Sequence, residues 1–393
     1  MTVTSPRVEP TNDRQWLRSL LGSDTSGSPV TYLARPSATE PRLLVPLRPR
    51  KVAAASMRRL NGGRAPSEAA AIGGARILAR LGLLRFAPGE VLTEPAFALV
   101  RHLASLLGEP GLTASITIGP PRRNRKPVLQ LLRPDGRVVG FAKVGWSDLT
   151  RDLVRNEAEV LRSAGGRFPH RVEAPGLVLV EEWRDLVVTV CSELRPPNGL
   201  PAGAPEAAEV VRLVSLIDRE RRSFHRLPML DEPALGPAAA AIDVPALSER
   251  HETVELTTAL WHGDLTPWNM VRRSGRTYLW DWEFAGPHRP VGFDLLHHRF
   301  EALRRSPRTA DYTPSDPFAP TMRLLEQVIA EAGDLLELVG VNDTPEQREA
   351  VIDAYLCELI VREDRLHGQL WDGGEMALLG PAATAVLKRR IAG

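Results

Sequence analysis

One short segment of the sequence carries the residue types that phosphoryl transfer requires. Residues 262–269 read His-Gly-Asp-Leu-Thr-Pro-Trp-Asn, so four residues separate Asp264 from Asn269. Twelve residues after Asn269, a short apolar run ends in Asp281, and a Ser-Gly pair lies between the two as a turn signal. The spacing predicts a loop followed by a β-hairpin, which returns the chain and brings Asp281 close to Asn269.

Phosphoryl transfer from a nucleotide needs a carboxylate that orients the attacking hydroxyl and accepts its proton. It also needs hard oxygen ligands for the Mg²⁺ ion that bridges the phosphates. Asp264 suits the first task, and Asn269 and Asp281 supply oxygens for the second. Protein kinases have the same His-x-Asp-x-x-x-x-Asn loop, followed by a metal-binding aspartate. The alternative interpretation is that Asp264 and Asp281 only cap a turn and a strand.

A nucleotide site of this kind also needs a strand cation near the phosphates and a helix carboxylate that holds it. Lys143 lies in the apolar run Phe-Ala-Lys-Val and is one of only four lysines among 50 basic residues. A compact ammonium on a flexible stem suits a phosphate contact better than the wide fork of arginine. The helix predicted to follow carries Glu157 and Glu159. The structural alternative is an edge-strand lysine and a solvated glutamate.

The elements around these residues predict a β-rich part followed by a helical part. Predicted strands cover residues 115–118, 127–132, 138–144 and 177–180. A Pro-Asp-Gly turn predicts a hairpin between the second and third strands, and an amphipathic helix is predicted over 147–164. Later helices are predicted over 206–227, 293–305, 321–332, 345–367 and 376–391. The adjacent His297 and His298 fall on different helix faces, so we do not expect them to share a metal ion.

The segment 262–269 together with Asp281 resembles the aminoglycoside phosphotransferase/choline kinase family, the bacterial small-molecule kinase branch of the protein-kinase-like superfamily. That family typically has glycine between the histidine and the catalytic aspartate, as at Gly263. The resemblance implies an α+β, protein-kinase-like two-lobed fold, with a small antiparallel β lobe and a larger helical lobe. It also implies ATP and Mg²⁺ as cofactors.

The resemblance assigns roles to the residues of the motif. It implies that Asp264 is the catalytic base and that Asn269 and Asp281 are the magnesium ligands. His262 is implied to be a structural residue of the loop. Asp294, in a Gly-Phe-Asp-Leu segment similar to the family's Asp-Leu pair, is implied to brace the loop, although a carboxylate at a helix N-terminus is an equally natural interpretation.

The resemblance also implies cofactor-binding residues in the small lobe. Glu157 fits the family's Glu-Ala-x-x-Leu pattern best as the partner of Lys143, and Glu159 is the second choice. The last predicted strand of this lobe would lead into a hinge that begins with Glu181 and Glu182 and meets the adenine edge through its backbone.

The predicted phosphate loop, residues 119–126, departs from the family pattern. It reads Gly-Pro-Pro-Arg-Arg-Asn-Arg-Lys, lacks the glycine-rich motif of protein kinases, and includes Pro120 and Pro121, which have no N–H to donate to a phosphate. Basic side chains, Arg123 among them, are candidates to take over the phosphate contacts. The alternatives are a solvent-exposed loop and a loop that recognises a polyanion.

Three regions are expected along the chain. Residues 1–110 form an N-terminal appendage or cap, residues 111–184 form the kinase-like N-lobe, and residues 185–393 form the kinase-like C-lobe with a helical C-terminal substrate region. Some bacterial sugar kinases of the superfamily, such as maltokinases, also carry an N-terminal cap. No motif in residues 1–110 establishes that kinship.

Composition limits the classes of function. The 393-residue chain is 43% apolar and 25% charged, and it contains no apolar run long enough to span a bilayer. Cys191 and Cys357 are too few for a disulfide framework, and no secretory signal is visible at the start. We therefore expect a cytoplasmic protein with no membrane partner, and disordered, collagen-like and membrane-spanning classes are excluded.

The net charge of +2 conceals an asymmetry along the chain. Residues 1–155 carry 24 basic and 11 acidic side chains, whereas residues 321–368 carry 4 and 11. The basic part could meet phosphates and the acidic part could attract a cationic acceptor, but solvated helix faces explain both equally well. Nucleic-acid binding needs a contiguous basic surface, and arginines scattered over 155 positions give it little support, so we do not expect it.

These observations predict an ATP-dependent phosphotransferase whose partners are a nucleotide and a small-molecule hydroxyl acceptor. The acceptor would be aminoglycoside-like, a sugar or an amino alcohol. An amino alcohol of the choline type would need an aromatic cage, for which the candidates are Trp261, Trp268, Trp282 and Trp371. The alternative function, suggested by the altered phosphate loop, is a catalytically weak nucleotide-binding pseudokinase or scaffold protein.

Overall fold

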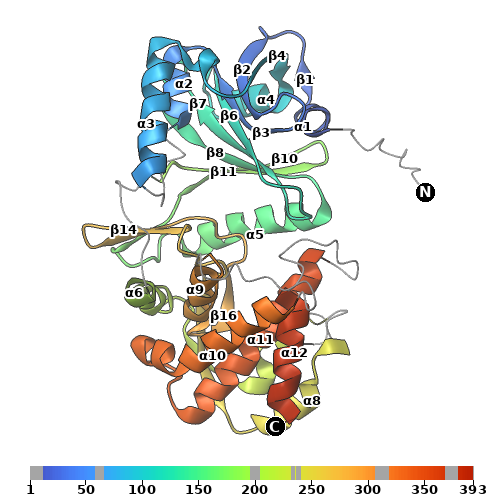
Figure 1. Ribbon diagram of the computed structural model, residues 1–393, viewed down its shortest axis with the longest axis vertical. Helices are drawn as coiled ribbons and strands as arrows, with labels where there is room; N and C mark the ends of the chain where they lie inside the picture. Colours follow the sequence, from blue (N-terminus) through green and yellow to red (C-terminus); the bar gives the residue numbers. More distant parts are fainter. Residues whose placement is uncertain are drawn as a thin grey trace, which may run out of the picture. The chain divides into compact units, whose positions relative to one another are not determined.

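The computed structural model describes residues 12–57, 66–194, 204–231, 235, 240–305, 318–367 and 379–392 (Figure 1). The chain divides into two compact units. Unit 1 consists of Met1–Ala158 and Pro175–Arg195, and unit 2 consists of Glu159–Ala174 and Pro196–Gly393. Unit 1 is built on an antiparallel sheet and unit 2 is mainly helical, which confirms the expected α+β class.

The centre of unit 1 is an eight-stranded antiparallel sheet in the order β10-β11-β8-β7-β6-β3-β2-β4. Its strands are β2 (Val30–Pro36), β3 (Pro41–Pro46), β4 (Glu90–Glu94), β6 (Thr113–Ile118), β7 (Pro127–Leu132), β8 (Val138–Gly145), β10 (Leu177–Trp183) and β11 (Leu186–Cys191). The hairpin predicted from Pro-Asp-Gly is confirmed as β7–β8, where Gly136 has φ 83° and its N–H donates to the Arg133 carbonyl at 2.8 Å.

Strands β2, β3 and β4, from the expected N-terminal appendage, extend this sheet. β3 pairs with β6 through Leu43↔Thr117 and Leu44↔Ile116, and β2 and β4 continue outward from β3. Helices α1 (Asp13–Leu21), α2 (Arg50–Ser56), α3 (Pro66–Leu81) and α4 (Ala98–Leu106), the short strands β1 (Ser23–Asp24) and β5 (Ala96–Phe97) and the 3₁₀ turn η2 (Leu84–Phe86) complete this part. The structure thus joins the expected appendage to the following strands through backbone hydrogen bonds.

The alternation of apolar residues along β8 determines the face of the sheet from which the Lys143 side chain projects. Ala142 and Val144 are fully buried in a core shared with Leu17 of α1 and Leu99 of α4. Because successive side chains of a strand point to opposite faces, Lys143 projects from the other face of the sheet.

Helix α5 (Asp148–Ala164) runs beside that other face. Thr189 of β11 is paired with Lys143 in the sheet, and its hydroxyl donates to the Val154 carbonyl of α5 at 3.2 Å. The helix begins where Thr150 Oγ1 accepts hydrogen bonds from the N–H groups of Trp146 and Ser147, both at 2.8 Å. These contacts fix the helix that carries Glu157.

The expected position of the hinge is wrong. Glu181 and Glu182 lie within β10, which turns back at Arg184 (φ 54°) and pairs with β11 as a hairpin. The apolar run 186–191 after this turn satisfies its backbone hydrogen bonds by inserting between β10 and β8. The chain therefore leaves unit 1 for the last time beyond β11, later than the sequence suggested.

Unit 2 combines helices with two small sheets (Figure 1). Its helices are α6 (Ala204–Val214), α8 (Val244–Arg250), α9 (Phe293–Arg304), α10 (Ala319–Val339), α11 (Pro345–His367) and α12 (Leu379–Ala392). The sheets have the orders β12-β13-β16 and β14-β15-β9, from strands β9 (Val172–Glu173), β12 (Glu220–Ser223), β13 (Glu255–Trp261), β14 (Met270–Arg273), β15 (Arg276–Leu279) and β16 (Gly286–Pro290). The 3₁₀ turns η3 (Phe224–Arg226) and η4 (Pro228–Leu230) follow β12.

The helix predicted over 206–227 is wrong in its second half. α6 ends at Val214, and the polar segment Glu220–Ser223 pairs with β13 as strand β12. Asp218, with φ 54°, lies in the turn between them. The predicted helices corresponding to α9, α10, α11 and α12 are confirmed, although α10 extends to Val339. In the described part of the chain, no helix has both the length and the apolar character that a bilayer crossing requires.

Candidate active site

The loop that carries Asp264 begins where β13 ends, and its path requires glycine at position 263. Gly263 has φ 80°, and a Cβ atom at this residue would lie 2.2 Å from the Phe284 carbonyl oxygen. Arg362 of α11 donates from Nη1 to the Gly263 carbonyl at 2.7 Å. The loop is therefore held between the chain around Phe284 and helix α11.

Gly263→Ala should lower the free energy of unfolding by about 3 kcal/mol, because a left-handed backbone and a steric overlap add together. Gly275 is a matched control: its φ is 73°, but nothing lies within 4 Å of the position of a Cβ atom. Gly275→Ala should cost about 1 kcal/mol, from the backbone alone. Denaturant unfolding of both variants measures the difference, and equal losses would show that the Phe284 carbonyl does not constrain the loop.

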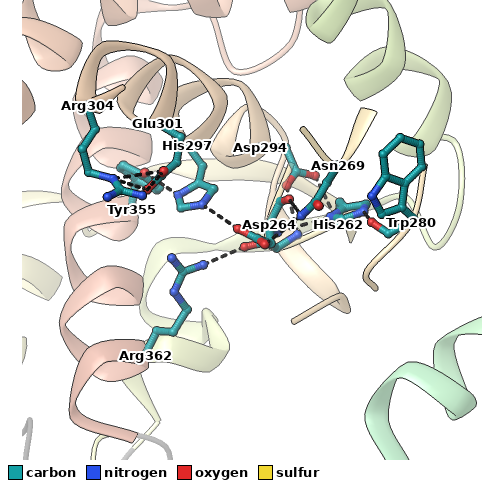
Figure 2. Close-up of polar contacts among 11 residues, drawn as sticks. His262, Asp264, Asn269, Trp280, Asp294, His297, Glu301, Arg304, Tyr355 and Arg362 are labelled. Carbon is teal, nitrogen blue, oxygen red and sulfur yellow. Dashed lines mark hydrogen bonds and ion pairs between the residues drawn. The ribbon is translucent and has the colours of Figure 1, made fainter. Parts of the chain in front are cut away.

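Asp264 is held by side chains from two elements (Figure 2). Asn269 donates from Nδ2 to Asp264 Oδ2 at 2.8 Å and to the Asp264 carbonyl at 3.0 Å. On the other side, His297 Nε2 of α9 lies 3.3 Å from Asp264 Oδ1. The Asp264 side chain is 26% exposed, so the carboxylate is fixed in position and still reachable from solvent.

The hairpin predicted after the loop is confirmed and brings Asp281 towards Asn269. β14 and β15 pair from Met270↔Leu279 to Arg273↔Arg276, and the Trp280 N–H donates to the Asn269 carbonyl at 3.3 Å. Asp281 follows at once, half-buried and with φ 72°. The register therefore places the backbone of Asp281 one residue beyond the partner of Asn269.

The donor set of this corner fits Mg²⁺. Both hydrogen bonds of the Asn269 amide described above use Nδ2, so Oδ1 is the atom that can act as a ligand, and Asp281 contributes a carboxylate. Among the described residues, no group of three or more His, Cys, Asp or Glu side chains has the arrangement of a metal cage. An amide and a carboxylate alone suit a hard ion that keeps waters and binds substrate phosphates.

His262 and Asp294 support the loop from inside the fold (Figure 2). Asp294, near the start of α9, accepts the N–H of His262 at 2.7 Å and the N–H of Gly263 at 3.0 Å. His262 Nε2 lies 3.1 Å from the Trp280 carbonyl, and its Nδ1 accepts the Asp264 N–H at 3.3 Å. His262 thus connects the start of the loop to the end of the hairpin.

The buried carboxyl of Asp294 gives a pH-dependent stability. Burial raises its pKa from 3.8 to about 7, although the N–H donors of His262 and Gly263 favour the charged form. Since the folded state then holds this proton more tightly than the unfolded state, its contribution to the free energy of unfolding falls as pH rises from about 4 to about 7. In unfolding experiments across this range, the stability advantage of the wild type over Asp294→Asn should shrink. An advantage that grows with pH would contradict the raised pKa.

Lys143 and Glu157 form a short ion pair within unit 1. Lys143 Nζ donates to Glu157 Oε1 at 2.7 Å, and the two side chains are 16% and 2% exposed. Glu159, the second choice as partner, is exposed on α5. Glu157 therefore fixes the position of a cation that remains partly accessible.

The carboxylates expected at the hinge take part in other ion pairs. Glu181 Oε1 lies 2.9 Å from His102 Nε2, and Glu182 Oε1 accepts from Arg155 Nη2 at 2.7 Å. Both contacts fasten β10 to neighbouring helices. In the structure, the Glu181 and Glu182 side chains therefore form ion pairs within unit 1.

The loop 119–126 uses one of its cations to attach helix α1. Arg125 is 9% exposed, donates to Asp13 Oδ1 at 2.8 Å and stacks on Trp16 with its guanidinium 4.6 Å from the ring centroid. Arg123 is exposed. The expectation that the basic side chains of this loop share a phosphate role therefore does not extend to Arg125.

Sequence reasoning missed His297, Tyr355 and Arg362, all of which support the loop (Figure 2). Tyr355 OH lies 3.2 Å from His297 Nδ1, and both residues are buried. His297 lies 33 residues from Asp264, and Arg362 lies 99 residues from Gly263. Tyr355 reaches the loop only through His297. In the sequence these are polar residues within predicted helices, and such a pattern does not indicate which distant residue each side chain contacts.

No protein-family model matches the chain, and a comparison with curated proteins also finds no match. Solved structures do match. A complex of a thermostable mutant of aminoglycoside phosphotransferase APH(4)-Ia with AMP-PNP and hygromycin B is 12% identical, with a TM-score of 0.47, and the match covers 75% of this chain and 98% of that chain.

Two further solved structures are similar over a comparable length. The GDP complex of aminoglycoside 2'-phosphotransferase-IIIa is 13% identical, with a TM-score of 0.40, over 74% of this chain and 96% of that chain. A protein described as a fructosamine-3-kinase, from Haemophilus somnus 129PT, is 11% identical, with a TM-score of 0.39, over 74% and 96%. Over about three quarters of its length, the chain is thus similar in structure to aminoglycoside phosphotransferases and to a fructosamine-3-kinase.

Proposed function

We propose that this protein is an ATP- and magnesium-dependent phosphotransferase that moves the γ-phosphoryl group to a hydroxyl of a small molecule, and that it belongs to the aminoglycoside phosphotransferase/choline kinase family. The observation that carries the proposal is the Asp264–Asn269 pair, bonded at 2.8 Å and followed by a hairpin that returns Asp281 beside Asn269. This is the donor pattern that a phosphoryl transfer site needs.

Each residue has a defined task in this proposal. Asp264 orients the acceptor hydroxyl and accepts its proton as the oxygen attacks phosphorus. Asn269, through Oδ1, and Asp281 hold the cation, and Lys143, placed by Glu157, binds the nucleotide phosphates. When bound, ATP with Mg²⁺ supplies the phosphoryl group and neutralises the charge that develops on its oxygens.

The acidic charge of residues 321–368, which could attract a cationic acceptor, does not restrict the acceptor to a cation. Many of these carboxylates are already paired with arginine or histidine: Glu326 with Arg389, Glu331 with Arg299, Glu349 with Arg390, Asp353 with His251 and Glu358 with Arg289. Because these pairs offset part of the acidic charge, the composition of residues 321–368 does not favour a polyamine over a neutral sugar as the acceptor.

A choline-type acceptor receives little support from the tryptophans named above. Trp261 and Trp282 are 5% and 0% exposed, so their rings belong to the core. The guanidinium of Arg305 covers the ring of Trp268, 3.3 Å from its centroid. Trp371 lies outside the described residues.

The test is a screen for ADP release against aminoglycosides, sugars, amino alcohols and nucleosides, with mass detection of the phosphorylated product. We expect Mg²⁺-dependent transfer to one acceptor class, with Asp264→Ala as the blank. Release of ADP and formation of product no faster than in this blank, for every acceptor, would contradict the proposal.

The second candidate is a nucleotide-binding protein with weak or no catalysis. It is favoured by Arg125, which the structure commits to Asp13 and Trp16 and thereby removes from any phosphate contact. Magnesium-dependent ATP binding without transfer to any acceptor of the screen would support this candidate.

A further inference from the structure

Both oxygens of the Asp264 carboxylate lie beside a side-chain nitrogen (Figure 2). Asn269 Nδ2, from the same loop, donates to Oδ2 at 2.8 Å. His297 Nε2, from α9, lies 3.3 Å from Oδ1. The second contact joins Asp264 to an element 33 residues away in the sequence, so the tertiary fold creates it.

The partners of His297 define which of its nitrogens carries the proton. A carboxylate only accepts hydrogen bonds, so the nitrogen that faces Asp264, Nε2, must be the N–H. In a neutral imidazole the other nitrogen is then an acceptor, and Tyr355 OH lies 3.2 Å from it. Burial raises the pKa of the Tyr355 hydroxyl, which therefore keeps the proton that it donates to Nδ1.

The surroundings keep this imidazole neutral. His297 is 1% exposed, and burial lowers its pKa to about 3. Arg362 and Arg304 act in the same direction, while Glu301 opposes them. A protonated His297 ring, 3.3 Å from Asp264 Oδ1, would stabilise the carboxylate further and weaken it as a proton acceptor, whereas the neutral ring orients it through the N–H at a smaller loss of basicity.

We propose that His297 is a positioning residue for phosphoryl transfer: Tyr355 fixes its neutral imidazole, which donates from Nε2 to Asp264 Oδ1 and holds the carboxylate in the orientation that receives the acceptor proton. The proposal rests on the proposed function. It adds a series of hydrogen bonds from Tyr355 of α11 through His297 of α9 to Asp264 of the loop. Neither the motif nor its spacing predicts these contacts.

The first test compares three variants in the transfer assay. His297→Leu should lower kcat by about 10–100-fold, because the carboxylate loses its orientation, while KM for ATP changes less than about threefold. His297→Gln, whose amide can present an N–H near the position of Nε2, should recover most of the loss. Tyr355→Phe should lower kcat by less, about threefold to tenfold, because only the tautomer preference is relaxed.

The pH dependence of kcat separates positioning from a loss of stability. Removing a hydrogen bond from the charged form of a carboxyl raises its pKa, so in His297→Leu the acidic limb should move up by about one pH unit. His251 is the control, since it is also buried and hydrogen-bonds a carboxylate, at 2.9 Å, that belongs to α11 (Asp353) and not to the loop. His251→Leu should lose stability without moving the limb.

The second test needs no catalytic activity. Nitrogen-15 NMR of the wild-type protein should show His297 as the neutral, Nε2-protonated tautomer, unchanged from pH 5 to pH 8. An Nδ1-protonated ring, or a ring that titrates in this range, would overturn the proposal, as would a His297→Leu variant with wild-type kcat and an unmoved acidic limb. If the wild type transfers phosphate to no acceptor, the proposed function fails, and the NMR result still decides the state of His297.

Discussion

Replacement of Asp264 with alanine or asparagine is expected to lower kcat by about 10²–10⁴-fold, the usual contribution of a positioned general base. The acceptor hydroxyl loses its proton acceptor in both variants. The KM for ATP should change little, because Asp264 is not assigned to the nucleotide or to the cation. Steady-state kinetics with the acceptor found in the screen measures both constants.

The two variants differ in stability in a way that checks the geometry. In Asp264→Asn, one atom of the new amide is an N–H₂ group, which must face a donor, either Asn269 Nδ2 or His297 Nε2. Asp264→Ala avoids that conflict, so it should be the more stable variant although it is at least as inactive. Wild-type ATP consumption by either folded variant would refute the role given to Asp264.

Replacement of Lys143 with methionine should lower kcat/KM for ATP by about 10²–10³-fold, because the phosphates lose a charged partner. The same change leaves Glu157, 2% exposed, without the ammonium 2.7 Å away. Removing one partner of a buried ion pair destabilises by about 3–5 kcal/mol. Loss of activity could therefore be mistaken for loss of folding.

The double variant Lys143→Met, Glu157→Gln separates the two effects. The neutral amide removes the uncompensated charge, so thermal unfolding should return towards the wild type while kcat/KM stays low. Lys143→Arg should recover only part of the activity, because a wide planar fork replaces a compact ammonium. Recovery of wild-type kcat/KM in the double variant would contradict the phosphate contact.

Local features of the site could be predicted from the sequence. Asp264, Asn269 and Asp281 lie within 18 residues, so one loop and one hairpin determine their arrangement. Lys143 and Glu157 also lie close together in sequence, on a strand and on the helix that follows it. In both groups of residues the local sequence pattern agrees with the tertiary structure, because only a short stretch of chain with few possible conformations connects the residues.

Features that depend on distant pairing could not be predicted. The polar segment 220–223 became a strand because β13 offered backbone partners, and helical periodicity contains no sign of such a partner. The hinge was expected at residues 181–184, too early in the chain, because the sequence of residues 177–183 does not indicate that a further strand, β11, inserts between β10 and β8. Sequence reasoning assigned no role to His297 beyond excluding a metal ion shared with His298, because its contact with Asp264 exists only in the folded chain.

The most direct test of the account measures the cation. Mn²⁺, in place of Mg²⁺, can be titrated in the presence of AMP-PNP and followed by electron paramagnetic resonance. The wild type should bind Mn²⁺ only with the nucleotide, Asp281→Asn should bind it at least about tenfold more weakly, and Asp264→Asn should bind it nearly as the wild type does. Wild-type protein that binds no Mn²⁺ with the nucleotide, or an Asp281→Asn variant that binds it equally well, would contradict the claim that Asn269 and Asp281 hold the ion.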